Sequence, residues 1–495
     1  MLSLTYAVPI AGFLISLASD TAAGPVSAPN IQWGNCSTAS TSLPLLDCGE
    51  IHVPIDWANP HGDQVTLGMA RYKASNPASR LGSLIFNPGG PGTPASEVVQ
   101  LAPYVFGSAL LEHFDILGLD PRGVGLSSPI RCDPFLYNQR VSNFPTTEAE
   151  FETMLDKYRA LGQSCGNLTG PLMAHLDAAS GARDVEAVRM ALGETQLNYL
   201  GLSYGTLLGA QYAQLFPQKI RAMALDGNMD HNEARTYSLV VSSSAYETEL
   251  VRFSSWCARN SSCALQGTDV LQLFDHLTAQ ADQHPIPAPA CNASGACRSD
   301  VTGEELRDNV RDWLSFKDPP GQLGLPGWVD LSVALAQASA GNATLLSTPL
   351  AQDASSSLFP ELAIYCLDWS RDSRSLTEVW TQQQMTATLM PHTRGVVEAN
   401  MPQVQCLGWP FPVQNPEHNA GINNTSPILL VNAQYDPLTS LAWAVGLQDQ
   451  IRTSVLLTRG GDGHTSYVLQ GETSRAIDAY LVNLTLPAAN TVLSS

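Results

Sequence analysis

One stretch, residues 197–210, constrains the fold of this chain more than any other. It reads Leu-Asn-Tyr-Leu-Gly-Leu-Ser-Tyr-Gly-Thr-Leu-Leu-Gly-Ala, an apolar run over 197–202 that merges into the pattern G-x-S-x-G at 201–205. A short, continuous apolar run is typical of a strand buried on both faces of a parallel sheet. The G-x-S-x-G pattern is typical of a sharp turn from strand to helix that lifts a serine hydroxyl above the sheet. The sequence therefore predicts strand, turn and helix here, with Ser203 as a candidate nucleophile.

The segments around this stretch alternate between patterns typical of strands and of helices. Apolar runs predict further strands at residues 81–86, 114–119 and 220–225. Helices are predicted at 178–192, from its amphipathic period, and at 206–216, which Pro217 ends. Such alternation favours a mostly parallel sheet with helices on both faces. Ahead of it, alternating polarity at 50–56 and 64–74 predicts one antiparallel pair of strands.

Residues 228–426 interrupt this rhythm. The interval carries turns and helical patterns without a regular series of strands, and its predicted helices are 237–257, 268–284, 302–315, 331–340 and 377–390. The strand pattern resumes at 427–433 and 454–458. We therefore expect an α/β fold, a mostly parallel sheet flanked by helices, built from residues 24–227 and 427–495. A large and mainly helical cap domain is expected to be inserted at 228–426.

The amino-terminal segment predicts secretion. Residues 2–17 are largely apolar and give way to a small, polar run at 18–23, so residues 1–23 form a predicted signal peptide. No Lys or Arg precedes Arg71, so the usual positive start is absent, and a membrane anchor is the alternative. We expect an extracellular protein with no membrane association after cleavage.

Cysteines and glycosylation motifs agree with that location. The ten cysteines fall into couples that are near in sequence, Cys36 with Cys48, Cys132 with Cys165, Cys257 with Cys263, Cys291 with Cys297, and Cys366 with Cys406. An even count behind a signal-like start favours five disulfides over metal sites, although the sequence alone does not fix their connectivity. Glycosylation motifs begin at Asn35, Asn167, Asn260, Asn292, Asn342, Asn423, Asn424 and Asn483. They predict a glycoprotein from a eukaryotic secretory pathway.

Charge and missing motifs exclude several classes of function. The chain has 25 basic and 45 acidic residues, a net charge of -20. Such a chain repels polyphosphate backbones, so we expect no nucleic-acid partner. The sequence has neither H-E-x-x-H nor the phosphate-binding pattern G-x-x-x-x-G-K-[ST]. No metal and no cofactor are therefore expected.

Two residues that follow the resumed strands complete a candidate catalytic group. Asp436 comes shortly after the 427–433 run, and His464 after the 454–458 run. The order Ser, Asp, His matches the α/β-hydrolase arrangement. We expect His464 to take the proton of Ser203 and pass it to the leaving group, while Asp436 fixes the tautomer and stabilises the imidazolium.

Each of these assignments has an alternative. Asp226 ends the 220–225 strand and could replace Asp436, whereas Asp462 is expected to shape the turn before the histidine. For the developing oxyanion we assign the backbone N–H groups of Tyr204 and Gly90. Gly90 belongs to a glycine- and proline-rich loop for which a plain tight turn is the alternative.

The combined motifs resemble a known family. They are Asn87-Pro-Gly-Gly-Pro-Gly92, Asp120-Pro-Arg-Gly-Val-Gly125, Gly201-Leu-Ser-Tyr-Gly205, Leu225-Asp-Gly227, Ala363-Ile-Tyr-Cys-Leu-Asp368, Asp436-Pro-Leu-Thr439 and Gly463-His464. Together they resemble secreted α/β-hydrolases of the tripeptidyl aminopeptidase and proline iminopeptidase group over nearly the whole mature chain. Two departures are Pro88, where proline iminopeptidases have His, and residues 480–487, which lack the glycine and final cysteine common in the tripeptidyl subgroup.

This resemblance implies an α/β-hydrolase fold and a serine peptidase that cleaves from a free amino terminus. It also implies that acidic residues of the cap hold the substrate's α-ammonium, and Glu233, Glu361 and Asp368 are candidates. For each of them a structural or exposed position is the alternative.

The sequence leaves the substrate open. One hypothesis is an exopeptidase that removes short peptides or residues from amino termini. The alternative is an ester, lactone or thioester hydrolase of a fungal secondary-metabolite pathway, and a third is a catalytically silent fold used for binding. The expected partner is a small peptide or acyl substrate, and the oligomeric state stays open.

Overall fold

The computed structural model describes residues 30–36 and 44–494. In these ranges ten strands form one sheet in the order β1-β2-β3-β5-β4-β6-β7-β10-β11-β12. Their bounds are β1 Gln32–Gly34, β2 Leu46–Pro54, β3 Gln64–Tyr72, β4 Gly82–Asn87, β5 Phe114–Leu119, β6 Leu197–Leu202, β7 Ile220–Asp226, β10 Ile428–Tyr435, β11 Val455–Asp462 and β12 Val492–Leu493. Pairing is antiparallel from β1 to β5 along this order and parallel from β5 to β12. The predicted mostly parallel α/β sheet is thereby confirmed.

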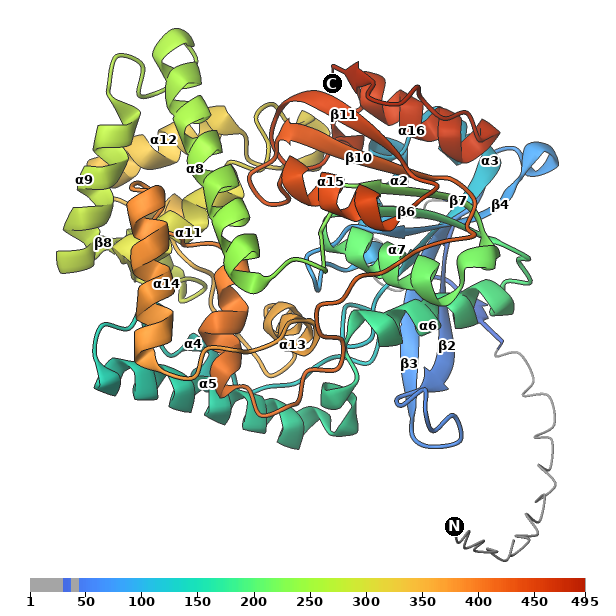
Figure 1. Cartoon of the computed structure of the whole chain (residues 1–495), viewed down its shortest axis with the longest axis horizontal. Coiled ribbons are helices and arrows are strands. Elements are labelled where there is room, and N and C mark those ends of the chain that lie inside the picture. The colour runs from blue at the N-terminus through green and yellow to red at the C-terminus, as the bar shows by residue number, and fades with distance from the viewer. Residues whose placement is uncertain (1–29, 37–43, 495) are drawn as a thin grey trace, which may run out of the picture.

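Helices cover both faces of the sheet (Figure 1). One face carries α1 (Ala95–Val99), α2 (Ala102–Val105), α3 (Ser108–His113) and α16 (Glu472–Asn483), and the other carries α6 (Ala178–Ala191), α7 (Tyr204–Leu215) and α15 (Leu441–Gln450). Strand β6 shows why both faces are needed. Its Tyr199 packs in the core beneath α6 and α7, whereas its neighbour Leu200 packs in the opposite core. Because successive side chains point to opposite faces, a strand that is apolar throughout must be covered on both.

The predicted helices of the 228–426 interval are present within a few residues. They are α8 (Arg235–Arg259), α9 (Val270–Gln283), α11 (Gly303–Trp313), α12 (Trp328–Ser339) and α14 (Leu376–Leu389), with α10 (Pro289–Ser294), α13 (Phe359–Asp368) and the two-residue strands β8 (Ile286–Pro287) and β9 (Asp300–Val301) beside them. Helices α8, α9, α11 and α12 share a core of their own, which includes Tyr246, Phe253 and Trp328. Helix α13 instead packs in the core beneath α6 and α7.

The connection from β5 to β6 also packs against this helical region. It contains α4 (Pro134–Asn138) and the long helix α5 (Glu148–Thr169), which lies below α13 and α14 in Figure 1. Arg140 forms ion pairs with Asp300 and Glu305 across the two segments, at 2.6 and 3.0 Å. A Cβ built on Gly408 would lie 2.3 Å from the carbonyl oxygen of Leu155, so α5 and the chain near residue 408 are in close contact.

Five disulfides join the ten cysteines in the couples that are near in sequence. Of the predicted glycosylation sites, Asn260 is partly buried and the other seven are exposed, which leaves glycosylation a prediction. The predicted signal peptide, residues 1–23, lies outside the described residues. Within the described ranges no helix has both the length and the apolar character needed to cross a bilayer.

Candidate active site

Ser203 lies in the sharp turn between β6 and α7, where the sequence predicts it. Its backbone has φ 55° and ψ −125°, a conformation that residues with a Cβ rarely adopt. The Ser203 N–H donates to the carbonyl oxygen of Asp226 at 2.9 Å, which ties the turn to the end of β7. A Cβ at Gly205 would lie 2.7 Å from the carbonyl oxygen of Asn87, so the turn has no space for a larger residue there.

Asp436 and His464 form a buried hydrogen-bonded pair. Nδ1 of His464 lies 2.9 and 3.0 Å from the two carboxylate oxygens of Asp436. Burial alone would raise the pKa of Asp436, but the charge and hydrogen bond of His464 bring it below its ordinary value. Burial would likewise lower the pKa of His464, and the Asp436 carboxylate reverses this, so the pKa of His464 is raised. The pair therefore favours imidazolium next to carboxylate, as a triad requires.

The alternative acid, Asp226, has a different set of partners. One of its carboxylate oxygens accepts from the N–H groups of Ser466 and Tyr467, both at 2.7 Å, just after the histidine. Its carboxylate makes no hydrogen bond to the imidazole among the described residues. Asp226 thus holds the backbone of the loop that follows His464.

Asp462 does more than shape a turn. Its carboxylate forms ion pairs with Arg252 of α8 and with Nζ of Lys317, the latter at 2.7 Å. The backbone two residues after Asp462 is held by a neighbouring residue of Lys317, because the His464 N–H donates to the carbonyl oxygen of Ser315 at 2.5 Å. Residues of the helical region therefore hold the loop of His464 by two ion pairs and one hydrogen bond.

Ser203 and His464 both contact the Asp226–Gly227 turn. A Cβ built on Gly227 would lie 3.3 Å from Cε1 of His464, and the preceding residue binds the Ser203 N–H. No hydrogen bond joins the Ser203 hydroxyl to the imidazole within the described ranges. In unliganded active sites this contact is often long and tightens only when substrate binds.

The two backbone donors assigned to the oxyanion lie in neighbouring segments. Tyr204 is the first residue of α7, where N–H groups have no acceptor within the helix. Gly90 lies in the loop after β4, with φ 108°. That loop touches the turn, since a Cβ on Gly89 would lie 2.8 Å from the Ser203 Cβ and 3.0 Å from the Tyr204 nitrogen. In the described part of the chain neither donor makes a hydrogen bond to protein.

A cavity of about 630 Å³ lies next to this loop, between α5, α11, α13 and the 396–405 segment. Carboxylates line it, contributed by Asp308 and Asp312 of α11, Glu361 of α13, and Glu398. Basic side chains also line it, those of Arg140, Lys157, Arg298 and Arg311. Of these, Arg311 contacts Asp312, Glu398 and Asp308 at 2.9, 3.4 and 3.6 Å. Burial, with Glu398 and Asp312 nearby, raises the pKa of Glu361 to about 8. Glu361 and Glu398 are half-buried, whereas Asp308 and Asp312 are exposed. Carboxylates gathered in this way favour a bound cation.

The cavity lies beside helix α13, which also contacts the loop of Gly90. Neither Ser203 nor His464 lines it, but a Cβ on Gly92 would lie 3.1 Å from the Glu361 backbone nitrogen. Of the acidic residues implied by resemblance, only Glu361 lines the cavity. Glu233 accepts a hydrogen bond from Trp443 at 2.8 Å, and Asp368 is fully buried behind Tyr204.

Comparisons with known proteins place the chain in a family. A model described as "alpha/beta hydrolase fold" matches residues 82–264, and one described as "TAP-like protein" matches residues 392–493. The chain is 28% identical to Serine protease Hip1 of Mycobacterium tuberculosis over 92% of its own length and 89% of that protein. It is 28% identical to Tripeptidyl aminopeptidase of Streptomyces coelicolor, over 93% and 85% of the two chains. It is 30% identical to Carboxylesterase B of Mycobacterium tuberculosis, over 95% and 91%.

The chain belongs to the TAP-like α/β-hydrolases. It is a serine hydrolase.

Two parts of the site in this TAP-like hydrolase were not predicted from the sequence. The Thr439 hydroxyl donates to Asp436 at 3.0 Å and lies 3.2 Å from Nδ1 of His464, so it contacts both members of the pair. The motif Asp436-Pro-Leu-Thr439, which places Thr439 three residues after Asp436, could have indicated this contact. Helix α5 lines the cavity, and its signal was the capping box of Thr147 and Glu150 at its start.

Proposed function

We propose that this TAP-like hydrolase is a secreted exopeptidase that acts at the amino termini of peptides, with Ser203, His464 and Asp436 as its catalytic triad. The observation that carries the peptide assignment is the carboxylate-lined cavity beside the Gly89–Gly92 loop. A free α-ammonium group is the charge that this cavity favours, and a carboxylate binds it by charge-assisted hydrogen bonds. Relatives named as a serine protease and as a tripeptidyl aminopeptidase support the same assignment.

The reaction follows from the positions of these groups. The Ser203 oxygen attacks the scissile carbonyl carbon while Nε2 of His464 takes its proton, and the carbonyl oxygen becomes an oxyanion facing the N–H groups of Tyr204 and Gly90. Collapse breaks the C–N bond, and the leaving amine takes the proton from His464. Water then attacks the acyl-serine with His464 as base, which releases the acid and restores Ser203.

The ammonium group is assigned to Glu361 and Glu398. The pKa of about 8 at Glu361 arises from burial and neighbouring carboxylates, so a cation between them removes the repulsion and keeps the carboxylate ionised. Helix α13 carries Glu361 next to the loop that supplies Gly90, which supports an ammonium site near the proposed oxyanion donors.

A second candidate keeps the triad and changes the substrate. The relative with 30% identity is named Carboxylesterase B, which favours an ester as substrate. In that case the leaving group is an alcohol, and the cavity carboxylates contribute nothing to binding.

One panel of substrates separates the two candidates. Chromogenic tripeptide p-nitroanilides with free or acetylated amino termini are assayed beside p-nitrophenyl esters, with the wild-type protein and with Glu361→Gln. We expect turnover of the free-amino peptides, at least a 10-fold loss in kcat/KM on acetylation, and a similar loss in Glu361→Gln. Glu233→Gln is the matched control, since Glu233 is a half-buried carboxylate with a pKa raised to about 7 by burial but lies outside the cavity lining.

The catalytic assignment has its own test. A fluorophosphonate probe is expected to label the wild-type protein and not Ser203→Ala. Turnover of esters alone would reject the exopeptidase assignment, and labelling that persists in Ser203→Ala would reject the triad.

A further inference from the structure

Helix α13 contacts both segments that supply the proposed oxyanion donors. At its start, Pro360 and Glu361 press on the glycine loop, because a Cβ on Gly92 would lie 3.0 Å from Cβ of Pro360. At its end, Asp368 accepts a hydrogen bond from the Tyr204 hydroxyl at 2.5 Å. One short helix therefore bridges the loop of Gly90 and the turn of Ser203.

Asp368 has the contacts of a fixed anchor and not of a substrate ligand. It is 0% exposed, and besides Tyr204 its carboxylate accepts from the N–H of Ala178 and from Nδ2 of Asn415, both at 2.9 Å. Its backbone carbonyl lies 2.6 Å from Nε2 of His231. Four contacts from four separate segments hold this residue, so its carboxylate has little freedom to move.

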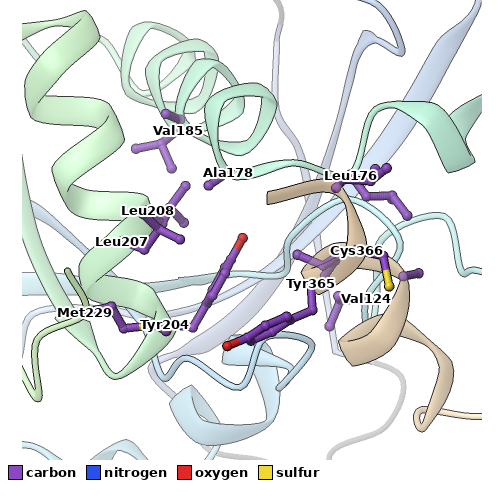
Figure 2. Packing of buried hydrophobic residues seen from close by; sticks show 14 of the residues in the cluster. Val124, Leu176, Ala178, Val185, Tyr204, Leu207, Leu208, Met229, Tyr365 and Cys366 are labelled. Carbon is purple, nitrogen blue, oxygen red and sulfur yellow. The ribbon is translucent and has the colours of Figure 1, made fainter. Parts of the chain in front are cut away.

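Tyr204 links that anchor to the turn. Figure 2 shows its ring between α7 and Tyr365 of α13, with the hydroxyl directed toward Ala178 at the start of α6. The peptide that joins Ser203 to Tyr204 carries the N–H assigned to the oxyanion. Ser203 has a strained backbone conformation. The peptide therefore keeps its orientation only if contacts of the surrounding residues hold it in place.

We propose that Asp368 is a positioning residue of the oxyanion hole, which acts through the Tyr204 hydroxyl to keep the Tyr204 N–H aimed at the developing oxyanion. The inference rests on the proposed function, since it presumes acyl transfer at Ser203. Asp368 itself touches no substrate.

The test compares ground-state binding with binding of a tetrahedral adduct. A trifluoromethyl ketone forms a bond from its carbonyl carbon to the Ser203 oxygen, whose proton passes to His464, and its own oxygen becomes the oxyanion. The inhibition constant of this ketone is measured beside kcat and KM for a p-nitrophenyl ester with the same acyl group. The variants are Tyr204→Phe, which removes one oxygen atom, and Asp368→Asn.

In both variants we expect kcat to fall about 10-fold, less than the 100-fold or more that follows loss of a whole donor. The inhibition constant of the ketone is expected to rise by the same factor, while KM stays within about 2-fold. The double variant is expected to lose no more than the worse single variant, because both changes break one contact.

Tyr212→Phe is the matched control. Tyr212 is a buried tyrosine on the same helix α7, and its hydroxyl donates to Glu186 at 2.7 Å, at the end of the helix away from Ser203. We expect it to lower the midpoint of thermal unfolding without changing the ratio of the ketone inhibition constant to KM.

Two results would overturn the inference. One is an equal loss of ester and ketone binding in Tyr204→Phe, and the other is a Tyr212→Phe variant with the same kinetic loss. Failure of the proposed function itself is recognised separately, by full activity in Ser203→Ala.

Discussion

Ser203 combines a reactive position with an unfavourable backbone. Its φ of 55° and ψ of −125° suit glycine, yet chemistry requires a side chain there. Contacts around Ser203 offset the cost of this conformation, among them the hydrogen bond to Asp226 and the close packing of Gly89 and Gly205. Strain at this one residue is thus part of what exposes the hydroxyl.

Two inactive variants measure this strain. Ser203→Gly relieves it, whereas Ser203→Ala keeps a Cβ in the same conformation. We expect Ser203→Gly to be more stable than Ser203→Ala by about 1 kcal/mol in the free energy of unfolding, after the entropic cost of glycine in the unfolded chain. Chemical denaturation of both variants provides the measurement. An alanine variant that is more stable than the glycine variant by the entropic cost of glycine, about 0.5–1 kcal/mol, would show that the turn is not strained.

In the proposed mechanism, the Asp436–His464 pair sets the pH dependence of activity. His464 acts as a base only when neutral, and its pKa is raised by Asp436 against the effect of burial, so activity is lost below a midpoint that lies above the ordinary 6.5. Asp436→Asn is expected to lower kcat about 10³- to 10⁴-fold and to move this midpoint to lower pH. Profiles of kcat/KM against pH test both effects. Asp226→Asn is the comparison. If its kcat falls as far as that of Asp436→Asn, Asp226 and not Asp436 is the acid of the triad.

At the level of elements, the helical region holds the loop that carries His464. Arg252 of α8 forms an ion pair with Asp462 and lies 3.5 Å above the ring of Tyr435, the last residue of β10. Lys317 and the Ser315 carbonyl hold the same loop. Arg252 therefore contacts both the loop of His464 and the end of β10.

Arg252→Met tests this coupling. It removes the charge and keeps most of the apolar stem, and we expect kcat to fall about 10-fold with KM little changed, because a small displacement of His464 is costly. Arg259→Met, at an exposed arginine in the last turn of the same helix, is expected to keep full activity. Steady-state kinetics decide the matter. Equal activity of the two variants would mean that α8 does not position the histidine.

The elements show which parts of the site could be predicted from the sequence. Strands β6 and β10 are largely apolar runs and β11 begins with one, so the sequence predicts where Ser203, Asp436 and His464 lie, while their catalytic roles stay a prediction. Helix α13 could not be predicted in this way, because all of its residues except Glu361 are buried, so no polar face marks it as a helix. The resemblance made Asp368 one of three candidates to bind the substrate ammonium group, with a structural position as the alternative, and its carboxylate lies behind Tyr204. Contacts between segments distant in sequence decide such roles, and periodicity does not record them.

At the scale of the whole molecule, net charge and cavity charge have the same sign. The chain carries a net charge of -20, and the cavity beside the glycine loop is lined with carboxylates. A negative field of this kind attracts cations from solution and is weakened by salt, whose screening length shortens as ionic strength rises. A peptide with a free amino terminus therefore gains from the field over a long range, and an uncharged ester does not.

This difference predicts how salt affects the two classes of substrate. Between about 10 and 300 mM NaCl, kcat/KM for a free-amino tripeptide p-nitroanilide is expected to fall about 3- to 10-fold, because both steering and ammonium binding are screened. A neutral p-nitrophenyl ester, which is hydrolysed by the same Ser203, is the internal control. Its kcat/KM is expected to change little with salt. In Glu361→Gln and Glu398→Gln the salt dependence of the peptide is expected to become shallower, since the local part of the attraction is reduced. Equal salt dependence for peptide and ester would remove the cavity carboxylates from substrate binding, and the field would then serve only to keep like-charged molecules apart.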